Sequence, residues 1–108
     1  MLRGLLHITE TCTVFHCFMY IMKEVTLEEL SSPGCQICKA FEEFWHSIES
    51  HFPNVRYKNI SATTPEGIEM AGTYEIFASP GIVLNGELFS AGKFDKDKFM
   101  KKLKEVSQ

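Results

Sequence analysis

The sequence predicts an α/β domain with a four-stranded mixed sheet and three helices, in the order strand, helix, strand, helix, strand, strand, helix. Two patterns predict this class. Short apolar runs alternate with segments whose apolar residues recur at the helical period, as in strands joined by crossover helices. The last two strands are instead separated only by Asn85-Gly86, a two-residue hairpin signal. The first two strands therefore run parallel, the last two run antiparallel, and helices cover both faces of the sheet.

The chain length and composition fit one globular domain. Of the 108 residues, 44% are hydrophobic and 23% are charged, which is close to the usual globular mixture. The 11 Lys and Arg residues against 14 Asp and Glu residues give a net charge of −3. No excess of positive charge is therefore available to hold a phosphate backbone. We expect a monomer that does not bind nucleic acid.

Residues 1–21 are expected to form an N-terminal extension ahead of a domain at residues 22–108. No run of about 20 apolar residues occurs, so no membrane-spanning helix is predicted. The apolar run over residues 14–22 has the outline of a secretory signal, but it leads into Lys23-Glu24 without a small-residue cleavage site. We expect a cytoplasmic protein without a membrane partner, in which the extension adds a strand, a helix or a tail.

The first strand is predicted over residues 23–31, and the first helix follows the turn Ser32-Pro33-Gly34. This helix is the clearest element, because its apolar residues recur at about the 3.6-residue period. Pro53-Asn54 ends it. Its residues expected to face the sheet are Ile37, Phe41, Phe44, Trp45, Ile48 and Phe52, and those expected to face solvent are Lys39, Glu42, Glu43 and Glu49.

A second strand at residues 55–62 leads into a short second helix. Thr63-Thr64-Pro65-Glu66 predicts the start of that helix, with threonine as its cap and proline in its first turn. The helix is expected to end near Tyr74. The hairpin strands are predicted over residues 81–84 and 87–91.

The last helix is predicted to begin after Asp95, whose side chain can cap it. Its apolar residues again follow the helical period, and its lysines occupy the other side. The residues expected to face inward are Phe99, Met100, Leu103 and Val106, and the outward lysines are Lys96, Lys98, Lys101, Lys102 and Lys104.

Cys35-Gln36-Ile37-Cys38 lies where the first strand gives way to the long helix. At the start of a helix, unpaired N–H groups and the positive end of the dipole stabilise a thiolate at Cys35. Cys38 lies about one turn further and borders the apolar face, so it can reach the sulfur of Cys35 while remaining buried. We interpret Cys35 as the exposed nucleophile and Cys38 as the cysteine that attacks a mixed disulfide.

Other interpretations of the cysteines stay open at this point. A C-x-x-C pair is unremarkable in a chain with four cysteines, and the same spacing forms half of a structural zinc site. Cys12 and Cys17, with His7 and His16 nearby, would supply the other half. In this alternative the protein is a zinc-binding structural module whose ligands are Cys12, Cys17, Cys35 and Cys38.

The domain resembles the thioredoxin-like superfamily. The resemblance rests on the C-x-x-C at a strand–helix junction and on residues 78–86, which look like that family's cis-proline loop, strand and hairpin turn. It implies a thioredoxin-like fold of order βαβαββα and a thiol–disulfide oxidoreductase activity. It further implies that the Ser79–Pro80 peptide bond is cis. The substrate-binding residues that it implies beside Cys35 are Gly34, Ser79 and Pro80.

Three positions depart from the patterns of thioredoxins and glutaredoxins. Gly34 stands where thioredoxins carry a tryptophan, and Ser90-Ala91-Gly92 replaces the double glycine of glutaredoxins. Glu29 falls where thioredoxins carry a buried acid that helps to move the proton of the second cysteine, but Glu28-Glu29 fits an exposed pair equally well. A glutathione-dependent glutaredoxin is therefore kept as an alternative.

From the residues and the resemblance we expect an enzyme that reduces protein disulfides by dithiol exchange through Cys35 and Cys38. No cofactor or metal is expected, because the cysteine pair itself carries the two electrons. The expected partners are disulfide-containing substrate proteins and a reductase or small-thiol donor that resets the pair.

Overall fold

The structure, a computed structural model, describes residues 22–108. The predictions for residues 1–21, including those for Cys12 and Cys17, lie outside the described residues. No helix between residues 22 and 108 is long and apolar enough to cross a membrane. The elements along the chain are β1 (Val25–Ser31), α3 (Gln36–Ile48), the 3-10 helix η1 (Glu49–His51), β2 (Val55–Ser61), α4 (Pro65–Tyr74), β3 (Gly81–Leu84), β4 (Glu87–Ala91) and α5 (Lys96–Ser107).

The four strands form one mixed sheet in the order β2-β1-β3-β4. β1 and β2 run parallel, whereas β3 is antiparallel to both β1 and β4. Asn85 and Gly86 make the turn between β3 and β4, with φ angles of 51° and 79°, which is the left-handed geometry that such a tight hairpin requires. The predicted order of elements and the mixed sheet are thereby confirmed.

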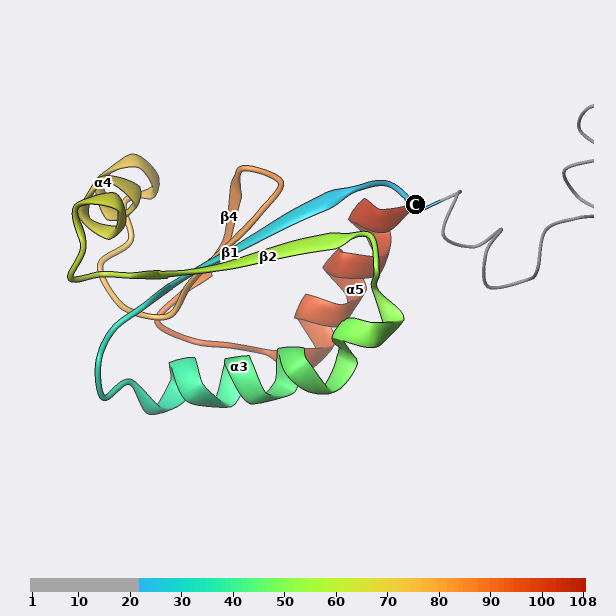
Figure 1. The fold of residues 1–108 in the computed structure, drawn as a ribbon, viewed down its shortest axis with the longest axis horizontal. Coiled ribbons are helices and arrows are strands. Elements are labelled where there is room, and N and C mark those ends of the chain that lie inside the picture. The colour runs from blue at the N-terminus through green and yellow to red at the C-terminus, as the bar shows by residue number, and fades with distance from the viewer. Residues whose placement is uncertain (1–21) are drawn as a thin grey trace, which may run out of the picture.

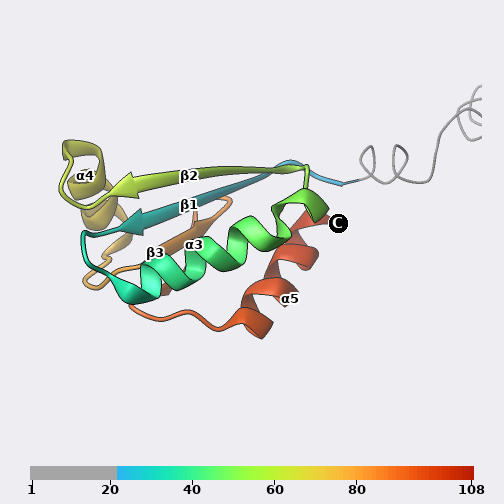
Figure 2. The same cartoon turned by 60° about the horizontal axis from the view of Figure 1, so that its bottom comes forward.

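The helices cover both faces of the sheet: α3 and α5 lie on one face and α4 on the other (Figure 1). Figure 2 shows α3 running along the sheet, with its first turn near the end of β1. Because side chains alternate along a strand, Leu27 packs under α3 and α5, whereas Leu30 packs under α4. The sheet therefore has a separate apolar cluster on each face.

Side-chain caps begin the last two helices where the sequence predicts them. The Thr64 hydroxyl accepts a hydrogen bond from the N–H of Gly67 at 3.1 Å. The Asp95 carboxylate accepts one from the N–H of Lys98 at 3.1 Å. Each cap satisfies a backbone donor that the first turn of a helix leaves unpaired, so these boundaries follow from local chemistry.

Two side chains of α3 depart from the predicted helix faces. Ile37 was expected to face the sheet, but it is 44% exposed, because Cys38 takes the buried position and neighbours on a helix point about 100° apart. Glu42 was expected to face solvent, but it is partly buried. It lies four residues after Cys38 and therefore on the same side of the helix.

Candidate active site

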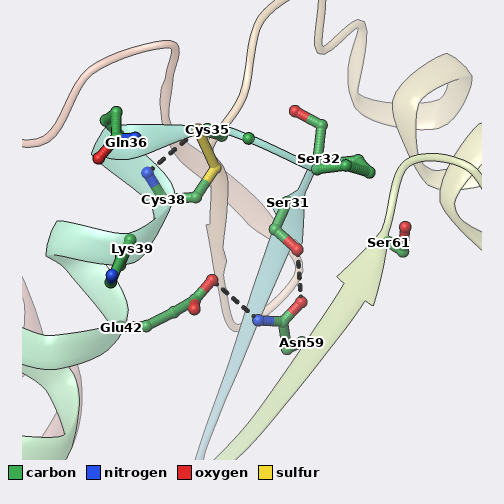
Figure 3. A pocket seen from close by; sticks show the side chains of 11 residues that line it. Ser31, Ser32, Cys35, Gln36, Cys38, Lys39, Glu42, Asn59 and Ser61 are labelled. Atoms are coloured by element: carbon green, nitrogen blue, oxygen red, sulfur yellow. Dashed lines mark hydrogen bonds between the residues drawn. A yellow bond between two sulfur atoms is a disulfide. The ribbon is translucent and has the colours of Figure 1, made fainter.

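Cys35 and Cys38 form a disulfide at the first turn of α3, with their Cα atoms 5.2 Å apart (Figure 3). Cys35 is the N-cap of α3, and its Sγ accepts a hydrogen bond from the backbone N–H of Cys38 at 3.1 Å. Gly34 has a φ of +78°, a left-handed conformation that suits glycine at the turn into the helix. Cys35 is partly exposed and Cys38 is only 2% exposed. Cys35 is therefore the sulfur that an approaching group meets first.

The loop before β3 lies next to the turn that carries the disulfide. Its Ser79–Pro80 peptide bond is cis, and Pro80 is fully buried. The hydroxyl oxygens of Ser79 and Ser32 lie 2.5 Å apart in a hydrogen bond. The carbonyl of Ser32 in turn accepts a hydrogen bond from the N–H of Cys35 at 3.2 Å. Ser32 therefore links this loop to the disulfide, although the two serines are 47 positions apart.

A cavity of about 550 Å³ opens beside the disulfide. Its walls are the start of α3 and the C-terminal ends of β1 and β2 (Figure 3). Because β1 and β2 are parallel, their carboxyl ends meet at one edge, where the register partners Ser31 and Ser61 both line the cavity. The charged residues in its wall are Lys39 and Glu42. We call this cavity the active-site pocket.

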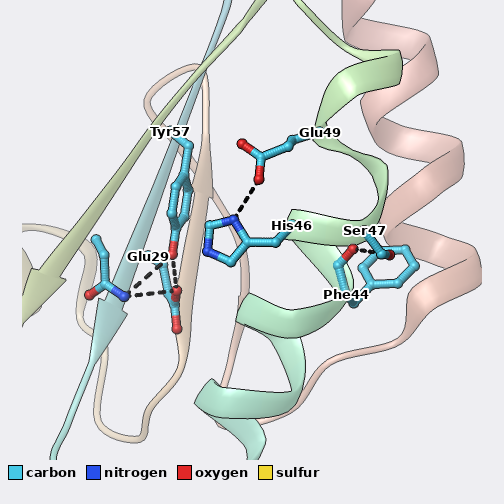
Figure 4. Close-up of polar contacts among 7 residues, drawn as sticks. Glu29, Phe44, His46, Ser47, Glu49 and Tyr57 are labelled. Carbon is cyan, nitrogen blue, oxygen red and sulfur yellow. Dashed lines mark hydrogen bonds and ion pairs between the residues drawn. The ribbon is translucent and has the colours of Figure 1, made fainter.

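Glu29 is a buried carboxyl on the side of β1 that faces α3. It is 0% exposed, so the exposed pair expected as one possibility for Glu28 and Glu29 is wrong. Its Oε1 accepts a hydrogen bond from Tyr57 Oη at 2.6 Å (Figure 4). Burial raises the pKa of Glu29 to about 8; the Tyr57 hydrogen bond lowers it, whereas hydrogen bonding and charge repulsion from Glu42 raise it further.

Asn59 on β2 connects Glu29 with the active-site pocket. The two residues are register partners in the parallel pair. The Asn59 amide nitrogen donates to Glu42 Oε2 at 3.0 Å and lies 3.4 Å from Glu29 Oε1. Its amide oxygen accepts a hydrogen bond from Ser31 Oγ at 2.6 Å (Figure 3). A chain of polar contacts therefore leads from the buried carboxyl to the pocket wall.

Sequence reasoning did not single out Tyr57, Asn59 or Glu42 as members of the site. The signals were present: Tyr57 and Asn59 are two residues apart on one face of a strand, and Glu42 follows Cys38 at a helical spacing of four. Neither signal says that these side chains meet at Glu29. That meeting depends on the pairing of β1 with β2 and on the packing of α3 across both strands.

Within residues 22–108, no group of three or more His, Cys, Asp or Glu side chains is placed to hold a metal ion. The zinc alternative needs Cys12 and Cys17, which lie outside that part of the chain. Its other two ligands, Cys35 and Cys38, are bonded to each other in the structure. A thiolate ligates zinc, whereas a sulfur in a disulfide has no thiolate to offer.

A mixed sheet of this topology, with a disulfide between cysteines at the first turn of its longest helix, defines a thiol–disulfide oxidoreductase of the thioredoxin-like class. Comparison with known families supports this classification. Residues 24–105 match the family model of the thioredoxin domain. The chain belongs to this family. Comparison with the curated proteins gives no significant match.

Solved structures of thioredoxins share the fold at low sequence identity. The X-ray structure of Fasciola hepatica thioredoxin matches with a TM-score of 0.64 and 17% identity, covering 98% of this chain and 91% of that one. Oxidised thioredoxin O2 from Arabidopsis thaliana matches with a TM-score of 0.65 and 10% identity, with 87% of each chain covered. Oxidised mitochondrial thioredoxin 3 from Saccharomyces cerevisiae matches with a TM-score of 0.61 and 20% identity, covering 84% of this chain and 86% of that one.

Proposed function

We propose that the protein reduces disulfides in substrate proteins by dithiol exchange through Cys35 and Cys38. The observation that carries this proposal is the hydrogen bond from the N–H of Cys38 to the Sγ of Cys35 at the start of α3. In the reduced protein the same N–H and the helix dipole stabilise a thiolate on Cys35. Cys35 is also the more exposed of the two sulfurs, so it is the nucleophile.

The proposed reaction has two exchanges. The Cys35 thiolate attacks one sulfur of the substrate disulfide, forms a mixed disulfide and releases the first substrate thiolate. Cys38 then loses its proton and attacks the Cys35 sulfur, which releases the second substrate thiolate and leaves the Cys35–Cys38 disulfide. The substrate gains two electrons, and its two thiolates take up protons according to their pKa values. A reductase or small-thiol donor returns two electrons to the pair, and no cofactor or metal takes part.

Glu29 is the proposed acceptor of the proton that Cys38 loses. Glu29 lies on the same face of β1 as Val25 and Leu27, which pack against α3, and Cys38 is the buried cysteine of α3. Burial raises the pKa of Glu29 to about 8, so this carboxyl exchanges its proton close to neutral pH, as a general base requires. A carboxyl with an ordinary pKa would hold a proton from a thiol much less readily.

Substrate recognition is proposed at Gly34, Ser79 and Pro80, around the exposed sulfur. The paired residues of β3 begin at Gly81, so Ser79 lies just outside the sheet register. Ser79 can therefore offer its backbone to an extended substrate segment, in the manner of an added strand. A monomer that reduces disulfides in this way is suited to the cytoplasm, where the thiol pool keeps dithiols reduced.

A trapping experiment tests the mechanism. In Cys38→Ser the nucleophile is kept but nothing resolves the mixed disulfide, so covalent complexes with a disulfide-bonded substrate protein should accumulate and dissolve in reductant. In Cys35→Ser, no complex should form and disulfide reduction with a dithiol donor should cease. Complexes are read from non-reducing gels and turnover from release of substrate thiols. A Cys35→Ser protein that works at the parental rate would falsify the proposal.

The same experiment separates the zinc alternative. Replacing Cys12 or Cys17 by serine should leave disulfide reduction largely unchanged if the chemistry belongs to Cys35 and Cys38. If the four cysteines instead share one zinc ion, all four replacements should damage folding alike, since each removes a ligand of the same site. Zinc content, measured on the parental chain before and after chelation, decides between these patterns.

A further inference from the structure

We propose that Glu42 controls the proton on Glu29 from the wall of the active-site pocket, with Asn59 holding the two carboxyl groups together. Glu42 would thus be a positioning residue for the exchange reaction. Its negative charge increases the affinity of Glu29 for a proton, and its carboxyl connects Glu29 with the water of the pocket. The use of Glu29 in turnover rests on the proposed function, whereas the coupling of the two carboxyls does not.

The first support is the position of the Asn59 amide between the two carboxyl groups. Its Nδ2 donates to Glu42 Oε2 at 3.0 Å and lies 3.4 Å from Glu29 Oε1. The hydrogen bond from Ser31 Oγ to the Asn59 oxygen, at 2.6 Å, fixes the amide in the orientation that aims its nitrogen at the acids (Figure 3). An amide nitrogen has two hydrogens, so one can point to Glu42 while the other is shared between Glu29 and the Tyr57 oxygen, which lies 3.3 Å from the same nitrogen.

The second support is the contrast in burial between the two acids. Glu29 is 0% exposed, and its Oε2 is buried without a hydrogen-bond partner in the described part of the chain. An unpartnered buried carboxyl oxygen costs much more free energy when the group is charged than when it is protonated. Glu42 is partly exposed and lines the same cavity as Cys35 and Cys38. Glu42 is the carboxyl in that wall, so it is the acid through which Glu29 communicates with the pocket.

The third support is electrostatic. Hydrogen bonding and charge repulsion from Glu42 both raise the pKa of Glu29, in addition to the larger effect of burial. The other groups facing this site do not replace Glu42. From β2, Tyr57 donates to Glu29, and burial raises its own pKa so that it stays a donor. From α3, His46 pairs with Glu49, and Lys39 lines the pocket. From β3, the register partner of Glu29 is the apolar Ile82.

The proposed route carries one proton from Cys38 through Glu29 and Glu42 to the pocket. The S–H bond of Cys38 breaks and an O–H bond forms on Glu29, while Cys38 attacks the Cys35 sulfur and the substrate thiolate leaves. The proton then passes from Glu29 to the Glu42 carboxylate, and from there to water in the pocket. Glu29 returns to its charged form, in which repulsion from Glu42 favours its reprotonation. No other oxidant or reductant is involved in this part of the reaction.

A direct titration of Glu29 tests the coupling. The side-chain carboxyl of Glu29 is followed by carbon-13 NMR against pH in the oxidised protein and in Glu42→Gln, which keeps an oxygen for Asn59 but removes the charge. The midpoint should fall by about one pH unit in Glu42→Gln, which is a tenfold change in the proton affinity of Glu29. Glu43→Gln is the matched control, because Glu43 is the adjacent exposed glutamate of α3. Its Glu29 midpoint should equal the parental one.

An unchanged Glu29 midpoint in Glu42→Gln would overturn the inference, as would an equal fall in Glu43→Gln. An Asn59→Ala background tests the bridge: the shift caused by Glu42→Gln should shrink there, and an undiminished shift would remove Asn59 from the proposal. These titrations need no substrate, so they do not depend on the proposed function.

A kinetic measurement then separates the two proposals. The rate at which Cys38 resolves a mixed disulfide is measured against pH. In Glu42→Gln the midpoint of this pH profile should shift to lower pH together with the Glu29 midpoint. If the midpoint moves and the profile does not, the carboxyl coupling stands and the role of Glu29 in the proposed reaction is wrong.

Discussion

Among single residues, Glu29 is the acidic side chain that is buried in the described part of the chain. It lies on the apolar side of β1, in line with Val25 and Leu27, at a position where an aliphatic side chain would pack without cost. Its hydrogen bond from Tyr57 compensates only one of its two oxygens. A buried acid retained under these conditions costs stability whenever it is charged.

Replacing Glu29 by glutamine should therefore stabilise the protein increasingly as the pH rises. The pKa of Glu29 is about 8 in the folded state against 4.5 as its ordinary value, so the folded state binds the extra proton between these pH values. The parental protein is therefore most stable below the lower pKa, and its free energy of unfolding falls as the pH rises toward the upper pKa. In that window the Glu29→Gln protein should gain up to about 1.4 kcal/mol per pH unit relative to the parent.

Urea unfolding at several pH values measures this difference, with Glu43→Gln as the exposed control. Parallel stability profiles for the parent and Glu29→Gln would show that Glu29 carries no raised pKa in the folded protein.

At the scale of elements, the two glycines of α4 have opposite roles. A Cβ on Gly67 would meet the backbone oxygen of Ser61 at 1.9 Å, so α4 crosses the end of β2 at a distance that only glycine permits. A Cβ on Gly72 would meet nothing within 4 Å. Gly67 is thus required by packing against the sheet, whereas Gly72 only adds conformational freedom to the unfolded chain.

The substitutions Gly67→Ala and Gly72→Ala should consequently change stability in opposite directions. Gly67→Ala forces backbone apart and should cost about 1–3 kcal/mol or more. Gly72→Ala should stabilise the helix by about 0.5–1 kcal/mol. Chemical denaturation of the two variants side by side gives both values. Equal effects of the two substitutions would contradict the close approach of α4 to β2.

Across the whole domain, one sheet separates two apolar clusters and couples their unfolding. Phe41, Trp45 and Phe99 belong to the cluster under α3 and α5, whereas Leu30 and Met70 belong to the cluster under α4. Both clusters are anchored on β1 and β3, since neighbouring residues of each strand point to opposite faces. Loss of packing on one face should therefore lower the stability of the other face as well.

The single tryptophan, Trp45, makes this testable because it reports on one face only. Leu30→Ala, on the opposite face, should lower the unfolding free energy by about 2–5 kcal/mol. It should shift the Trp45 fluorescence transition and the far-ultraviolet circular dichroism transition by the same amount. A Trp45 transition that keeps its parental midpoint would mean that the two faces unfold independently.

Local sequence patterns were enough to predict the order and nature of the elements between residues 22 and 108. Helical period, the caps at Thr64 and Asp95, and the Asn85-Gly86 turn all act within a few residues of the chain. The cysteine pair was predictable for the same reason, since its spacing and its place at a helix start are local properties. Such features can be predicted from a single sequence because the interactions that produce them join residues close together in the chain.

The surroundings of that pair depend on long-range contacts, which no local pattern predicted. Ser32 meets Ser79 across 47 positions, and Tyr57 reaches Glu29 across 28. Glu42 was assigned to the solvent side because its own helix says nothing about the strands beneath it, although Asn59 lies there at hydrogen-bonding distance. The parallel register that sets Glu29 opposite Asn59 arises when β1, β2 and α3 pack together. Long-range contacts of this kind depend on how apolar faces are buried jointly, and no local pattern encodes which polar side chains that burial will bring face to face.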